Sequence, residues 1–131
     1  MFANDFTLQI FDLFFELIHI LLISFVILGA FFKKTRKFHL VALGLILFSW
    51  LGLGVYYGWG YCFLTDIHWY IKDQLGQVNL PPSYITYLFS LVGIKLTILQ
   101  SNIIASVVLL LAIFFSIYFN LKDRNQKKDL Y

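Results

Sequence analysis

Three long apolar stretches constrain the fold of this chain more than any other feature. They cover residues 6–32, 38–57 and 99–119, and each approaches or exceeds the roughly 20 helical residues that cross a bilayer core. With 60% hydrophobic residues and a mean hydropathy of +0.81, a chain of 131 residues carries more apolar surface than a soluble domain of that size can bury. The sequence therefore predicts an all-α membrane protein with three transmembrane helices, in a single membrane domain over residues 1–121.

The basic residues predict how these helices are oriented. Eight of the ten Lys and Arg residues lie in two places, the first connection and the C-terminal tail. Under the positive-inside rule both places are cytoplasmic. We therefore expect the N-terminus outside and residues 122–131 as a disordered cytoplasmic tail. The eight residues are Lys33, Lys34, Arg36, Lys37, Lys122, Arg124, Lys127 and Lys128.

A shorter apolar segment, residues 83–98, precedes the last stretch. A full crossing there would place the basic tail outside, against the positive-inside rule. Its polar and small residues recur every three or four positions, as on one face of a helix. We expect this helix to lie at the outer interface or to dip partly inward, with a break at residues 100–102. The recurring residues are Thr86, Ser90, Gly93 and Thr97.

The stretch GWGYCFLTDIHWYIKDQLG, residues 58–76, follows the second span. Aromatic residues at its start are typical of a chain leaving the lipid. A short helix is expected from about residue 66 to 75, with Thr65 as its N-cap and Gly76 as its end. This helix should lie flat on the outer surface, so that residues 58–98 form an external cap containing two short interfacial helices.

The first span carries ionisable residues that lipid normally excludes. Asp12, Glu16 and His19 are spaced by four and three residues, so they share one face of a helix. Groups at such depth usually face protein or water and frequently have a function. One hypothesis is a ligand-binding or proton-relay site in the outer leaflet, closed above by the cap. The other is a structural hydrogen-bond network that holds the helices together. The candidate residues are Asp12, Glu16, His19, Cys62, Asp66 and His68.

The single cysteine, Cys62, allows several interpretations. It excludes an internal disulfide and a cysteine-only metal site. With His68 it matches a nucleophile and base in residue type only, because no oxyanion turn or third partner accompanies the pair. Zinc binding by these two residues and carboxylates lacks the usual ligand spacing. We predict no catalytic residue, and the sequence identifies neither a metal nor a cofactor.

Two further patterns in the helices limit the possibilities. A haem held by His19 and His39 is excluded, because these residues would lie at different depths in the membrane. Gly54 and Gly58 have the spacing that lets membrane helices approach closely. We expect these glycines to serve helix packing within this chain.

Two segments, ELIHILLISFVILGAFF and KFHLVALGLILFSWLGLGVYYGWGYCFLT, resemble the small bacterial membrane proteins grouped as domain of unknown function 2784. That family has a His and a Gly in the first helix, a His at the start of the second, and then a Gly-Trp-x-Cys-Pro-Leu-Thr stretch followed by a Glu. Phe63 and His68 depart from it, standing at the positions of the Pro and the Glu. The resemblance covers roughly residues 15–120, implies the same topology, and directs attention to His19, Cys62 and His68 as one cluster. The matching residues are His19, Gly29, His39, Trp59, Cys62, Leu64 and Thr65.

The sequence supports three functional hypotheses. The first is a non-catalytic integral inner-membrane protein that serves as an accessory or assembly subunit of a larger membrane complex, because the chain is small and lacks a complete catalytic set. The second is a membrane protein that binds a metal ion, quinone, haem or lipid in an outer-leaflet site. The weakest is a thiol-dependent membrane enzyme. All three describe a multi-pass bacterial inner-membrane protein that contacts the bilayer and, in the first, protein partners, with no nucleic-acid partner.

Overall fold

The computed structural model describes residues 4–131, which form helices and no strand. Three helices are long and apolar enough to cross a membrane, as the sequence predicts. The second of them is continuous but contains a π-helical segment, η1, between α2 and α3. The three long helices are α1 (Asp5–Leu28), the run Arg36–Tyr57 made of α2 (Arg36–Leu47), η1 (Phe48–Leu53) and α3 (Gly54–Tyr57), and α6 (Ile98–Lys128).

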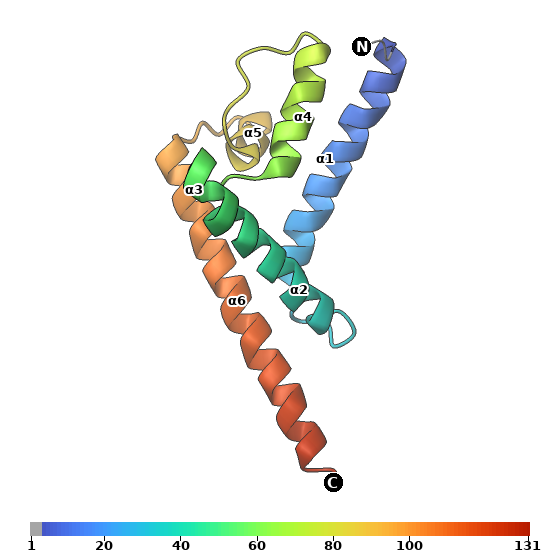
Figure 1. Ribbon diagram of the computed structural model, residues 1–131, viewed down its shortest axis with the longest axis vertical. Coiled ribbons are helices and arrows are strands. Elements are labelled where there is room, and N and C mark those ends of the chain that lie inside the picture. Colours follow the sequence, from blue (N-terminus) through green and yellow to red (C-terminus); the bar gives the residue numbers. More distant parts are fainter. Residues whose placement is uncertain (1–3) are drawn as a thin grey trace.

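The long helices form an open arrangement with the two short helices at one end (Figure 1). The first and second long helices meet at their connecting loop and diverge from it, while α6 packs along α2. Near the divergent ends lie α4 (Phe63–Gln74), which packs on α1, and α5 (Tyr84–Leu91), which packs on α6. A cavity lies between α1 and the other long helices, beneath α4 and α5.

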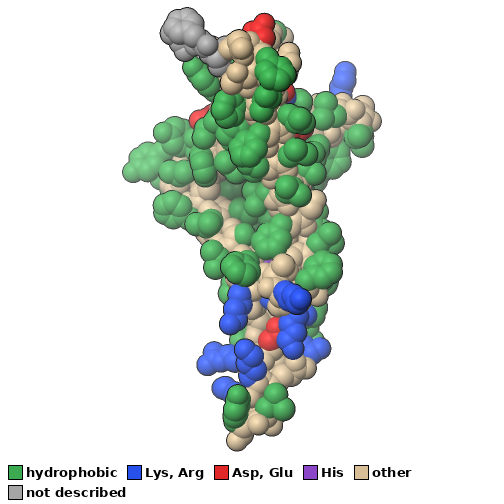
Figure 2. Space-filling view, turned by 90° about the vertical axis from the view of Figure 1, so that its right-hand side faces the viewer, with side chains coloured by type: hydrophobic (Ala, Val, Ile, Leu, Met, Phe, Trp, Pro, Cys, Tyr) green, Lys and Arg blue, Asp and Glu red, His purple; other side chains and the backbone are tan. Residues whose placement is uncertain are grey.

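A small apolar core joins α2 to α6. Leu43, Leu109 and Ala112 are buried together, and Val26 and Trp50 pack against them. Most other apolar side chains of the long helices are exposed, and they cover the upper part of the surface in Figure 2. Such a surface suits contact with lipid, because the hydrocarbon replaces the protein interior as the apolar environment.

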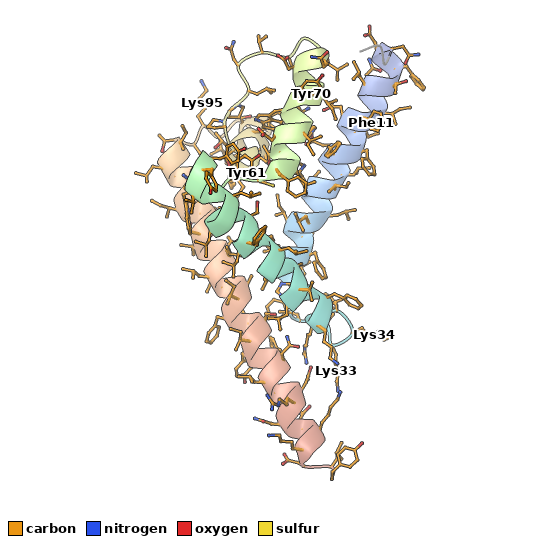
Figure 3. All side chains as sticks on the ribbon, viewed as in Figure 1. Phe11, Lys33, Lys34, Tyr61, Tyr70 and Lys95 are labelled. Atoms are coloured by element: carbon orange, nitrogen blue, oxygen red, sulfur yellow. The ribbon has the colours of Figure 1, made fainter. Side chains whose placement is uncertain are left out.

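The basic residues gather at the end of the molecule away from the short helices. Figure 2 shows Lys and Arg side chains concentrated toward this end, and Lys33 and Lys34 are labelled there in Figure 3. The α1–α2 connection and the C-terminal part of α6 lie on this same side (Figure 1). We refer to it as the basic end, and to the side formed by α4 and α5 as the cap end.

The tail expected to be disordered instead continues α6 as far as Lys128. Arg36 explains part of this order, because its Nη1 lies 2.7 Å from Asp123 Oδ1. The guanidinium carbon of Arg36 also lies 4.6 Å from the centroid of the Phe119 ring. These contacts fix the beginning of the tail against α2.

The segment before α6 also differs from the expectation. α5 ends at Leu91, and Gly93 then adopts a positive φ of 84° that reverses the chain. Thr97 caps α6: its hydroxyl accepts from the Gln100 N–H, while the Gln100 side chain accepts from the Thr97 N–H. This reciprocal capping box starts a helix at the residues where a break was expected, so the break lies at residues 92–97 instead.

The first short helix begins earlier than predicted and has a different orientation. Its N-cap is Cys62 instead of Thr65, and Gly76 ends the segment with a φ of 80°. Figure 1 shows α4 running antiparallel to the N-terminal half of α1, whereas the sequence suggested a helix lying flat on the outer surface. The reason is that α4 buries a polar face against α1.

The paired glycines of the second span make no close helix contact among the described residues. A Cβ at Gly54 would meet only Ser49 and Trp59 backbone atoms, both at 3.9 Å, and one at Gly58 would meet open space. Gly58 instead has a φ of 106° and lies where α3 ends. Its conformation redirects the chain toward α4, which is a turn requirement and not a packing requirement.

Candidate functional site

A charged cluster lies where α4 packs antiparallel to α1. His68 Nε2 and Lys72 Nζ each lie 2.8 Å from Asp12 Oδ1. Both nitrogens also lie 3.8 Å from Glu16 Oε2. His68 and Lys72 are buried, whereas the two carboxylates keep about a fifth of their side chains exposed. Spacing of four residues on both helices brings all four groups together.

Lys72 supplies the positive charge of this cluster. Burial opposes its protonated form, but the interactions with Asp12 and Tyr87 together outweigh burial and raise the pKa of the ammonium group above its usual value. The ammonium also lies 5.0 Å from the centroid of the Tyr87 ring on α5. Lys72 therefore stays charged and joins α1, α4 and α5 by electrostatic contacts.

His68 is the neutral donor of the cluster. Burial lowers the pKa of its imidazole, and the Lys72 charge acts in the same direction, while Asp12 opposes both. Because the carboxylate can only accept, Nε2 carries the proton that is donated to Asp12. The other ring nitrogen, Nδ1, is buried and has no hydrogen-bond partner within residues 4–131.

Tyr84 connects α5 to the same carboxylates. Its hydroxyl donates to Glu16 Oε1 at 2.7 Å. Burial, together with the hydrogen bond to Glu16, strongly raises the pKa of the Tyr84 hydroxyl, so it remains a donor. The Tyr84 ring also stacks on His19, with ring centroids 4.1 Å apart. Two helices, α4 and α5, therefore converge on the acidic face of α1.

His19 and Cys62 form a second polar group, one turn deeper along α1. His19 Nδ1 donates to the Phe15 carbonyl at 2.7 Å, so Nε2 carries the lone pair. That lone pair accepts from the Thr65 hydroxyl at 3.2 Å. Burial would raise the pKa of the nearby Cys62 thiol, but hydrogen bonding with His19 and with the start of α4 lowers it overall. Cys62 thus associates with His19 and not with His68.

The first cluster has the geometry of a cation site, and an ammonium group already lies beside it. Ligand atoms of Asp12, Glu16 and His68 all lie within 4.8 Å of one another, a set that suits a divalent metal. Lys72 approaches the same two carboxylate oxygens. The carboxylates are therefore balanced by a protein cation, and a metal ion would have to displace the ammonium group.

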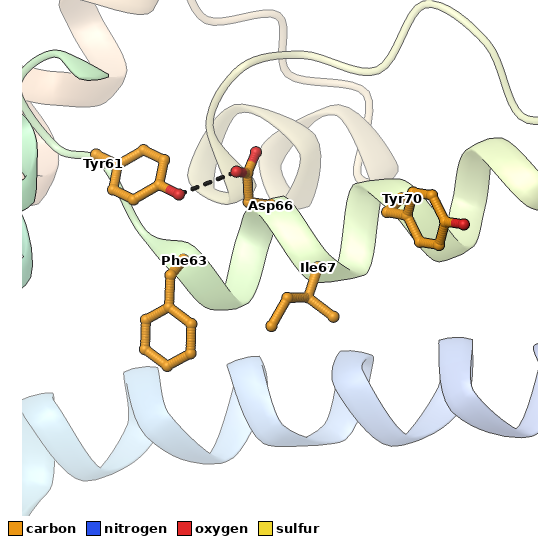
Figure 4. Close-up of a pocket in the computed structure, with 5 residues that line it drawn as sticks. All are labelled: Tyr61, Phe63, Asp66, Ile67 and Tyr70. Atoms are coloured by element: carbon orange, nitrogen blue, oxygen red, sulfur yellow. Dashed lines mark hydrogen bonds between the residues drawn. The ribbon is translucent and has the colours of Figure 1, made fainter. Parts of the chain in front are cut away.

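Asp66 does not join either polar group. It is exposed, and its carboxylate accepts a hydrogen bond from the Tyr61 hydroxyl at 2.9 Å (Figure 4). Together with Phe63, Ile67 and Tyr70, these residues line a shallow pocket of about 280 Å³ on the side of α4 (Figure 4). Of the six candidate residues, the structure brings five into two adjoining groups and leaves Asp66 at their edge.

A larger cavity of about 780 Å³ lies beneath α4 and α5. Its walls come from all three long helices and both short ones, and they are mainly apolar and aromatic. His19, Cys62 and Thr65 form a polar corner in this wall. The chain's three tryptophans, Trp50, Trp59 and Trp69, all line it as well. His19, the buried polar residue of α1 nearest this space, therefore borders a cavity large enough for a small molecule.

Sequence reasoning missed Lys72, Thr65 and Tyr84 as members of the site. The signal for Lys72 was present, because it follows His68 by four residues and so shares its helix face. Thr65 was assigned only a capping role. Tyr84 carried no local signal, because its partner Glu16 lies 68 positions away in the sequence.

Fold and site together define a small α-helical membrane protein with three potential spans and a polar-cornered cavity beneath two short helices. The family described as Protein of Unknown function (DUF2784) matches residues 9–120. The chain belongs to this family, which confirms the resemblance noted from the sequence. No curated protein and no solved structure matches the chain.

Proposed function

We propose that this protein binds a lipid-soluble small molecule in the cavity beneath α4 and α5. The observation that carries the proposal is the cavity itself, whose volume of about 780 Å³ falls within the range of roughly 300–1,000 Å³ typical of ligand sites. Mainly apolar walls with a few polar groups at one corner also match such sites. Because α1, α2 and α6 are apolar on their outer faces, a ligand would enter from the bilayer.

The polar groups on α1 support this function in two ways. The Asp12–Lys72 pair and the Glu16–Tyr84 hydrogen bond attach the short helices that close the cavity. His19 and Cys62 face the cavity and supply polar contacts there. An accessory or assembly subunit, by contrast, would use its outer surface. That surface carries exposed apolar side chains on all three long helices. Contact with lipid would bury these side chains as well as contact with a protein partner would.

We also propose that the protein lies in the inner membrane of a bacterium, with the basic end in the cytoplasm. The clustering of Lys and Arg at one end supports this orientation. Thiol labelling of intact cells tests it in a Cys62→Ala background. Gln77→Cys, on the exposed loop after α4, should react with a membrane-impermeant reagent. Lys34→Cys, at the basic end, should react only after permeabilisation, and the reverse pattern would overturn the orientation.

Two neighbouring valines on α6 provide a matched test of ligand binding. Val108 lines the cavity, whereas Val107 is half exposed on the outer face of the same helix turn. In Val108→Phe the added ring occupies cavity space, and we expect affinity for the uncharged methyl ester of a spin-labelled fatty acid to fall about tenfold or more. Val107→Phe should bind as the unsubstituted protein does, because its ring points away from the cavity.

The measurement is quenching of tryptophan fluorescence in the purified, detergent-solubilised protein. Saturable quenching that Val108→Phe weakens and Val107→Phe preserves supports the proposal. Equal quenching in both variants would mean that the probe associates with the outer surface, and the proposed site would be wrong. Native mass spectrometry of the same sample shows the alternative directly: a protein without bound small molecules but with stoichiometric protein partners would favour an accessory subunit.

A further inference from the structure

The walls of the cavity contain no positive charge. Among the described residues that line it there is neither Lys nor Arg. The one carboxylate at its edge, Asp66, accepts a hydrogen bond from the Tyr61 hydroxyl. A phosphate placed inside would lose its hydration without gaining a cationic partner, which is costly. The cavity therefore disfavours the headgroups of phospholipids and of lipid-linked phosphates, and it favours an uncharged ligand.

Aromatic side chains make up much of the wall. Trp50 and Trp59 lie edge to face with ring centroids 5.7 Å apart, and Trp69 contributes from α4. Flat conjugated rings gain offset-stacked and edge contacts with such side chains, beyond the burial of apolar area. A saturated acyl chain would fill the same volume without using this geometry.

Polar groups face the cavity from two different sides of the fold. At the polar corner, the Thr65 hydroxyl proton is committed to His19, and the Cys62 thiol is hydrogen-bonded within the same corner. On α6, Asn102 lines the cavity with a side-chain amide that carries two N–H donors. A Cβ added at Gly60 would come within 3.3 Å of Asn102 Oδ1, so the bare backbone of Gly60 leaves room for this side chain.

We propose that the ligand is a quinone, that is, an uncharged planar ring with oxygen acceptors on two edges and an apolar tail. This inference rests on the proposed ligand-binding function and names the chemical class of the ligand. The ring lies among the tryptophans, one carbonyl oxygen accepts from Asn102, and the other faces the Cys62 corner. The tail extends between α1 and α2 toward the lipid, where Leu22, Val26 and Ile46 line the cavity.

The test uses short-tailed benzoquinone and naphthoquinone probes. Because all three tryptophans line the cavity, a quinone bound there should quench the fluorescence saturably. Asn102→Leu keeps a similar volume but removes both N–H donors. We expect the quinone concentration at half-maximal quenching, the midpoint, to rise about tenfold. Val107→Phe is the control and should leave the midpoint unchanged. Added phosphatidylglycerol should not compete.

The outcomes separate this inference from the proposed function. If the quinone quenches only in proportion to its concentration while the spin-labelled methyl ester still binds and Val108→Phe blocks it, the quinone assignment is wrong and ligand binding stands. If Asn102→Leu binds the quinone as well as the unsubstituted protein, the assigned position of the ring is wrong. If neither probe binds saturably, both proposals fail.

Discussion

The two ends of the molecule each bury a histidine completely, and they use it differently. At the basic end, His39 Nε2 donates to the Val26 carbonyl at 2.9 Å. At the cap end, His68 Nε2 donates to the Asp12 side chain at 2.8 Å. In both residues Nδ1 is buried without a hydrogen-bond partner in the described part of the chain. The imidazole environments are therefore similar, but the partners differ.

The polar contacts at the basic end are mostly directed at the backbone. Thr35 donates to the Gly29 carbonyl at 2.8 Å, and Arg36 Nε donates to the Ala30 carbonyl at 2.9 Å. Packing there is tight, since a Cβ at Gly29 would lie 2.7 Å from His39 Cδ2. These features close the turn between α1 and α2 and leave no space for a ligand at Gly29.

At the cap end, side chains bond to side chains of other helices, and the second polar group faces a cavity. Such contacts depend on the relative position of α1, α4 and α5, whereas backbone-directed contacts mostly fix a local turn. The comparison indicates that the basic end is structural and that the cap end is where ligand chemistry is to be sought.

The largest expected effect comes from breaking the cluster of the cap end. Lys72→Met removes the ammonium group that balances the carboxylates of Asp12 and Glu16 in a largely buried site. We expect the free energy of unfolding to fall by about 3 kcal/mol or more. Lys95→Met, on an exposed loop, is the control and should change little. Denaturant titration in detergent measures both variants.

A double variant tests whether the loss arises from unpaired charge. Lys72→Met combined with Asp12→Asn removes a charge of each sign, so it should be more stable than the sum of the single losses predicts. Additive losses would mean that Lys72 and Asp12 act independently, and the cluster would not be an ion pair.

The next effect tests the tight packing of the basic end. In Gly29→Ala the new Cβ would lie 2.6 Å from the Phe25 carbonyl oxygen and 2.7 Å from the His39 ring. We expect a loss of about 1–3 kcal/mol, because the neighbours must shift. Gly44→Ala meets nothing within 4 Å and should gain several tenths of a kcal/mol from helix propensity. If the basic end is purely structural, ligand midpoints stay unchanged in both folded variants.

A pH-dependent effect is expected from His68. Its pKa is lowered in the folded state, so below about pH 6.5 the unfolded chain binds a proton that folded His68 does not yet bind. Stability should therefore decrease as the pH falls from about 6.5 toward the folded pKa, by at most about 1.4 kcal/mol per unit for one proton. His68→Gln should show a shallower slope in this window, and an identical slope would contradict the assignment.

The smallest effect separates two threonines that both make buried hydrogen bonds. Thr65→Val removes the donor to His19, and Thr35→Val removes the donor to Gly29. Each should lower the free energy of unfolding by about 1 kcal/mol. Only Thr65→Val should also weaken ligand binding, because Thr65 lines the cavity. Equal binding in both variants would place the ligand away from the polar corner.

Local patterns in the chain account for much of the fold. Runs of apolar residues predict the three long helices, since the helix is the form in which a segment satisfies its own backbone groups in lipid. Helix spacing also places Asp12, Glu16 and His19 on one face. The capping of α6 by Thr97 and Gln100 was readable too, as a Thr followed three residues later by Gln, although the break was predicted at residues 100–102.

What the sequence alone determined is thus the helical membrane class, the basic end and the acidic face of the first helix, all of which follow from composition and periodicity. Only the tertiary structure decided what that face contacts. Lys72 and Tyr84 reach it from helices that are distant in the sequence, and Cys62 turns toward His19 instead of His68. Packing of α4 along α1 selects these partners, and the space left beneath it is a property of the assembled helices that no single segment encodes.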